Sequence, residues 1–148
     1  MNPEFERAFE KDLNALIQEI NLCDEQTQLW TVLPGITNSI GNLAQHLIGN
    51  LNHFIGATLG NSGYVRNRSA EFEERYFTKE ALIEQLRTTS MLVVQVIHSL
   101  TPEQLNAVYP YEPYGYPMSC EHMILKLSNH LGYHLGQINY LRRILNGK

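Results

Sequence analysis

Four segments of the chain carry apolar residues at helical spacing. They span residues 3–22, 39–59, 78–100 and 119–145, and in each the apolar positions recur every three or four residues. This periodicity is typical of helices that turn one face toward a hydrophobic core. Strand patterns are almost absent. The pattern therefore predicts an all-α protein built as a four-helix bundle.

Two of the predicted connections, those after the second and third helices, are long. The first follows the sequence GNSG at residues 60–63, and residues 64–77 are rich in charge with few apolar positions, which indicates a surface segment. The second contains YPYEPYGYP at residues 109–117, where the prolines oppose a helix. Its tyrosines could wall a pocket at one end of the bundle, although packing of the loop itself is the simpler interpretation.

The length of the chain fits one domain, which we expect to span residues 1–148. No apolar run approaches the roughly 20 residues that a membrane-spanning helix needs. Residues 1–6 are acidic where an export signal would be basic. We therefore expect a cytoplasmic protein with no membrane partner.

The formal net charge of −4 argues against a nucleic-acid partner, because such proteins present a clustered basic surface. Arg66 and Arg68 are a local exception in the charged connection. Their planar guanidinium groups could bind a substrate carboxylate. Pairing with the neighbouring Glu71, Glu73 and Glu74 is the favoured interpretation.

The fourth predicted helix carries a pair of histidines, His130 and His134. A spacing of four residues places both side chains on one helix face. The same row continues with Leu127, Gln137 and Leu141, so the histidines are expected to point into the bundle. An HxxxH pair alone is a weak signal for metal, because such pairs also occur in ordinary helices.

The second predicted helix carries a polar row where a structural seam would hold leucine. His46, Asn50 and His53 share this row, and His53 is a geometric alternative to His46 as a ligand. Three imidazoles would leave zinc or nickel one open position for water or substrate. Asn50 and Gln137 are candidates to orient the imidazoles. No function is expected for His98 or His122, which lie near helix ends.

Two segments of the chain resemble the signature segments of the DinB superfamily. They are SIGNLAQHL at residues 39–47 and NHLGYHLGQI at residues 129–138, and RNRSAEF at residues 66–72 resembles a loop motif of one DinB-like branch. The resemblance implies a four-helix bundle of up-up-down-down topology. It also implies a divalent metal held by one histidine of helix two and the HxxxH pair of helix four, which carries over to His46, His130 and His134.

Characterised DinB relatives include transferases that use low-molecular-weight thiols. By this resemblance the protein is expected to be an enzyme whose metal lowers the pKa of a thiol or water for attack on an electrophile. The alternative is a non-catalytic stress-response protein in which metal or ligand occupancy stabilises the bundle. An open coordination position beside an accessible pocket would favour catalysis.

A homodimer is the expected assembly. Related bundles commonly pair through helix faces, and the first and third helices offer apolar residues such as Phe5, Met91 and Val93 beyond the needs of one core. No residue pattern identifies the substrate, so the substrate class rests on analogy alone.

Overall fold

The four amphipathic segments form the long helices of the structure, a computed structural model that describes residues 1–147. They are α1 (Pro3–Asn21), α2 (Ile40–Leu51), α4 (Lys79–Ser99) and α6 (Cys120–Asn146). A serine or threonine hydroxyl accepts a backbone hydrogen bond at the start of α2, α4 and α6, as expected for an N-cap. The predicted all-α fold is confirmed, and no strand occurs in residues 1–147.

Short helical elements complete the described chain. A 3-10 turn, η1 (Gln26–Trp30), precedes α2, and a π-helix, η2 (Asn52–Ala57), continues it. In the π segment the amide of Thr58 donates to the carbonyl of His53 at 3.1 Å. The two long connections contain α3 (Arg68–Glu73) and α5 (Pro102–Asn106), which sequence periodicity does not predict because each is little more than one turn.

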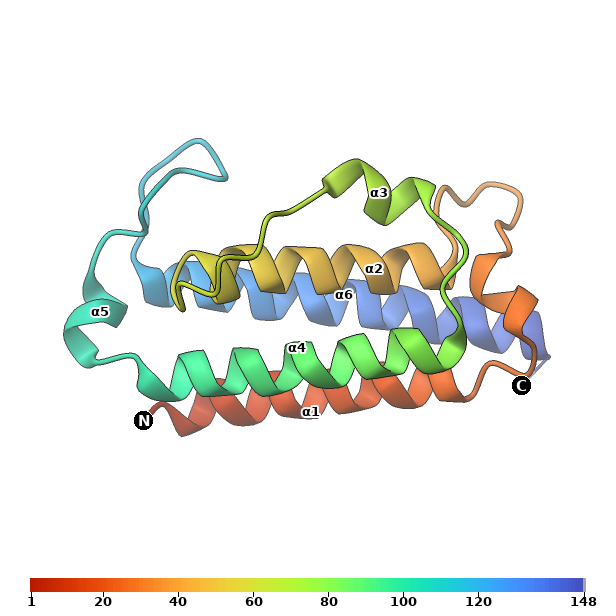
Figure 1. Cartoon of the computed structure of the whole chain (residues 1–148), viewed down its shortest axis with the longest axis horizontal. Helices are drawn as coiled ribbons and strands as arrows, with labels where there is room; N and C mark the ends of the chain where they lie inside the picture. The colour runs from red at the N-terminus through yellow and green to blue at the C-terminus, as the bar shows by residue number, and fades with distance from the viewer. Residues whose placement is uncertain (148) are drawn as a thin grey trace.

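The long helices run in two directions (Figure 1). The side chain of Asn2 at the start of α1 donates to the carbonyl of Ile97 at the end of α4, so these helices are antiparallel. Asn139 of α6 donates to Glu19 near the end of α1, so those two are parallel. In chain order the arrangement is up-down-down-up, which corrects the expected up-up-down-down order. The connection that contains α3 runs back along the bundle, and α4 therefore starts at the same end as α2 (Figure 1).

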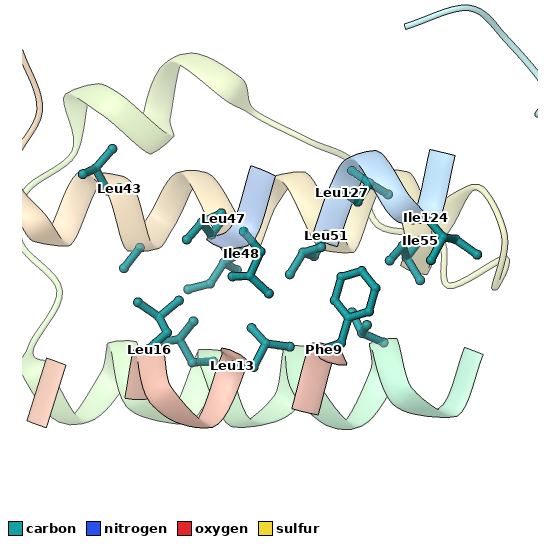
Figure 2. Close-up of a cluster of buried hydrophobic side chains, with 14 of the residues drawn as sticks. Phe9, Leu13, Leu16, Leu43, Leu47, Ile48, Leu51, Ile55, Ile124 and Leu127 are labelled. Atoms are coloured by element: carbon teal, nitrogen blue, oxygen red, sulfur yellow. The ribbon is translucent and has the colours of Figure 1, made fainter. Parts of the chain in front are cut away.

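One hydrophobic cluster lies between the four long helices (Figure 2). Each fully buried leucine or phenylalanine contributes about 1.5–3 kcal/mol through removal of apolar surface from water. None of the helices within residues 1–147 is both long and apolar enough to cross a membrane. Completely buried members of the cluster include Phe9, Leu13 and Leu16 of α1, Leu47 and Leu51 of α2, and Ile124 and Leu127 of α6.

The apolar residues of α1 and α4 are less available for an interface than the sequence suggests. Val93 is completely buried and Phe5 packs against the core, because α1 and α4 lie side by side along the bundle. Met91 remains 74% exposed. Of the three residues expected to serve a homodimer, only Met91 is presented on the outside.

Candidate metal centre

Three histidine side chains meet in the groove between α2 and α6. The Nε2 atom of His130 lies 3.1 Å from Nε2 of His46 and 3.1 Å from Nε2 of His134. Each of the three offers a ligand atom, and these atoms all lie within 4.8 Å of one another. The structure therefore brings together the three histidines that the sequence analysis selects.

The geometry of this cluster fits a divalent ion. Nitrogen ligands at about 2.0–2.1 Å from a tetrahedral zinc stand about 3.3 Å apart. The observed separations of 3.1 Å are close to this value. The second ring nitrogens of His46 and His134 contact side-chain oxygens, so their Nε2 lone pairs face the cluster. Three neutral imidazoles suit zinc or nickel better than calcium or magnesium.

A buried carboxylate orients His46. Nδ1 of His46 donates to Oε1 of Glu71 at 3.0 Å, and Glu71 is only 5% exposed. Arg66 holds the same carboxylate through two bonds, Nε to Oε2 at 2.8 Å and Nη2 to Oε1 at 2.9 Å. Arg66 therefore pairs with Glu71, which is the interpretation favoured from the sequence. Arg68 instead lies over the ring of Phe72, 5.4 Å from its centre.

Electrostatics keeps these groups in the forms that favour a metal. Burial raises the pKa of Glu71, but hydrogen bonds from His46 and Arg66 outweigh it and hold the pKa below its usual value. Burial, assisted by the neighbouring His134, lowers the pKa of His130 to about 4. Burial also lowers the pKa of His134, although its bond to Gln137 opposes the shift. The imidazoles of His130 and His134 are therefore neutral near pH 7, the form that binds metal.

The position of Glu71 depends on close contact between α3 and α2. A Cβ atom at Gly49 would lie 1.8 Å from Oε2 of Glu71, so only glycine leaves room for the carboxylate. The side-chain amides of Asn42 and Gln45 each donate to the backbone carbonyls of Glu71 and Glu74 at 2.9–3.1 Å. The prediction that residues 64–77 form a surface connection is thus wrong at Glu71, which is buried. The buried amides and the glycine on α2 are the sequence signal that points to this docking.

The remaining residues selected from the sequence take different positions. Gln137 accepts from Nδ1 of His134 at 2.7 Å, the orienting contact that was anticipated. Asn50 is buried, but its Oδ1 has no hydrogen-bond partner within residues 1–147. His53 lies outside the cluster, and its Nε2 shares a hydrogen bond with the hydroxyl of Tyr111 at 2.8 Å. Packing of the tyrosine-rich loop against η2 accounts for that contact.

A cavity of about 830 Å³ opens beside the cluster. His134 and Gln137 lie at its edge, and the loop of residues 35–38 forms part of its wall. Helix α2 contributes Leu43, and the rest of the lining comes from the exposed face of α6. Of the three histidines, only His134 lines the cavity, so the cavity meets the cluster at that residue.

Comparisons with known proteins agree with this architecture. A DinB-like protein from Bacillus cereus ATCC 10987 superimposes with a TM-score of 0.75 at 16% identity, over 96% of this chain and 91% of that one. A DinB-like protein from Bacillus subtilis gives 0.72 at 15% identity, over 97% and 92%. A conserved protein from Enterococcus faecalis gives 0.78 at 16% identity, over 100% and 98%.

These likenesses concern the fold, since the identities are low. A search of curated proteins finds no match to this chain. The sequence model of the DinB superfamily matches residues 7–138, which include all three histidines. The chain therefore belongs to the DinB superfamily.

Proposed function

We propose that the protein is a metal-dependent enzyme with one divalent ion, zinc or nickel, held by His46, His130 and His134. The observation that carries the proposal is the convergence of three imidazoles beside a cavity, with Nε2 of His130 3.1 Å from Nε2 of both His46 and His134. When bound, an ion with three protein ligands lowers the pKa of a thiol or water at its open position.

The surrounding side chains have defined roles in this proposal. Glu71 accepts a hydrogen bond from Nδ1–H of His46 and so keeps the Nε2 lone pair directed at the cluster. Gln137 does the same for His134 through its carbonyl oxygen. Arg66 neutralises the buried carboxylate without entering the cluster itself.

The substrate side of the proposal rests on family analogy. We favour a low-molecular-weight thiol as cosubstrate, because borderline metals with nitrogen ligands accept sulfur readily. The thiol proton would pass to solvent, and the sulfur would form the new bond to an electrophilic carbon. The bond from that carbon to its leaving group would break at the same time, and the leaving group would depart with the bonding electron pair. Hydrolysis by activated water is the second reaction that the same site supports.

The assembly is also a proposal. One continuous hydrophobic cluster supports a single domain.

Met91 projects from α4 beside a shallow hollow of about 410 Å³ that Glu10 and Val94 also line. We propose a homodimer through this outer face of α1 and α4, which light scattering at micromolar concentration tests directly.

The decisive experiment is a conjugation screen. The full-length protein, loaded with zinc or nickel, is mixed with cysteine or glutathione and a panel of electrophiles, and His130→Ala is run in parallel. Metal-dependent conjugation or hydrolysis that His130→Ala lacks would support the proposal. Stoichiometric metal with no reaction above the His130→Ala level would favour the non-catalytic alternative.

A further inference from the structure

We propose that the cavity beside His134 binds an uncharged, largely apolar small molecule whose polar end meets His134 and Gln137. This inference rests on the proposed function, because it names the substrate class of the same site. The cavity volume of about 830 Å³ falls within the range of sites for small organic ligands, roughly 300–1,000 Å³.

The walls of the cavity expose an unusual amount of apolar surface. Tyr133, Tyr140 and Ile144 are 64%, 67% and 63% exposed, and all three project from one face of α6. Ile36 faces them from the loop before α2 and is 44% exposed. An apolar partner that covers such side chains stabilises the complex, because apolar surface is removed from water. Two aromatic rings in one wall favour a flat ring in the ligand.

The polar groups of the cavity restrict the ligand further. None of the described residues that line it is a lysine, arginine, aspartate or glutamate. Arg143 lies over the ring of Tyr140, 5.5 Å from its centre, but it is not part of the lining. A charged ligand inside the cavity would lose hydration without a charged lining residue to pair with. The carbonyl oxygen of Gln137 is engaged by His134, so its amide NH₂ remains as a donor at the end nearest the histidines. An acceptor such as a carbonyl oxygen suits this position.

Gly136 lies between the two tyrosines on the cavity face of α6. A Cβ atom there would meet no other atom within 4 Å, and its backbone needs no unusual conformation. Nearly every other residue favours a helix more than glycine does. A side chain at Gly136 would therefore fill the cavity while helping the helix. Gly132, one turn earlier, is a matched position outside the cavity, where a Cβ would only touch Asp12 at 3.9 Å.

The test uses two fluorescent probes that differ in charge. N-phenylnaphthylamine is uncharged, and anilinonaphthalene sulfonate has the same ring system with a sulfonate added. Both are titrated into the full-length protein, metal-free and zinc-loaded. We expect the uncharged probe to bind at least about tenfold more tightly than the sulfonate, a difference of about 1.4 kcal/mol.

The matched variants locate the site. Gly136→Leu should weaken binding of the uncharged probe by about tenfold or more, whereas Gly132→Leu should bind it like the parent. Zinc affinity should be the same in both variants. Equal probe binding by parent and Gly136→Leu, or preference for the sulfonate, would overturn the proposal. A change of oligomeric state in Gly136→Leu alone would also overturn it, because the face would then be an interface between copies.

Probe binding is independent of turnover, so the two proposals can fail separately. Probe binding that Gly136→Leu abolishes, without any conjugation activity in the parent, would leave the apolar site standing and remove the enzymatic role. Conjugation activity in a protein that does not bind the uncharged probe would support the enzymatic role and remove the apolar site.

Discussion

The Nδ1 atom of His46 lies 3.0 Å from Oε1 of Glu71, and this contact joins α2 to the short helix α3. The two residues are 25 positions apart in the chain. A carboxylate on the far nitrogen of a metal-binding histidine fixes the ring orientation and raises its basicity as a ligand. The contact therefore links the docking of α3 to the affinity of the candidate metal centre.

Glu71→Gln should weaken zinc binding by about 10–100-fold, because the amide cannot supply the negative charge that favours the Nδ1–H form of His46. Competition against a chromophoric chelator measures this change. Glu73→Gln is the matched control, since Glu73 is exposed on the same short helix. An unchanged affinity in Glu71→Gln would mean that His46 needs no carboxylate partner.

Gly49→Ala tests the same contact from the other side. The added Cβ would occupy the place of Oε2 of Glu71, so the carboxylate must move away from His46. We expect weaker zinc binding and a loss of stability of about 1–3 kcal/mol from overpacking. Gly132→Ala provides the comparison and should be neutral or stabilising by up to about 1 kcal/mol, as for an exposed helical glycine. Equal melting temperatures for the two variants would contradict the docking of α3 described above.

The parts of the fold that the sequence predicts are those that depend on local spacing. His130 and His134 share a face because they lie four residues apart on one helix, and the amphipathic pattern turns that face inward. The role of Glu71 could not be found in this way, since it is one of several charged residues between positions 66 and 75 and its burial depends on Gly49 of another helix. The order of helix directions is likewise set by where the long connections end, and periodicity carries no information about that.

Metal loading should raise the stability of the folded protein. A ligand that binds only the native state at a hundredfold excess over its Kd adds about 2.7 kcal/mol to the free energy of unfolding. Thermal melting with zinc, and again after chelation, measures the effect. His130→Ala should show no such difference, because it lacks the histidine that lies between the other two. A parent protein that melts at one temperature under both conditions would argue against a native metal site.

The final prediction concerns which histidines bind the metal. His130→Ala or His134→Ala removes half of the chelating pair on α6, and His46→Ala removes the ligand that joins α2 to α6. Each substitution should weaken zinc binding by at least about tenfold, a loss of about 1.4 kcal/mol or more. The fold itself should survive, because the buried leucines around the site are unchanged.

The other histidines provide controls within the same chain. His98 pairs with Glu6 at 3.2 Å, and His122 is exposed in the first turn of α6, so their alanine variants should bind zinc like the parent. His53 is the sharpest comparison, because it shares the sequence row of His46 but contacts Tyr111 instead of the cluster. His53→Ala should therefore retain zinc. Retention of zinc by His46→Ala together with its loss in His53→Ala would show that the third ligand is His53 of η2 and not His46 of α2, contrary to the three converging imidazoles.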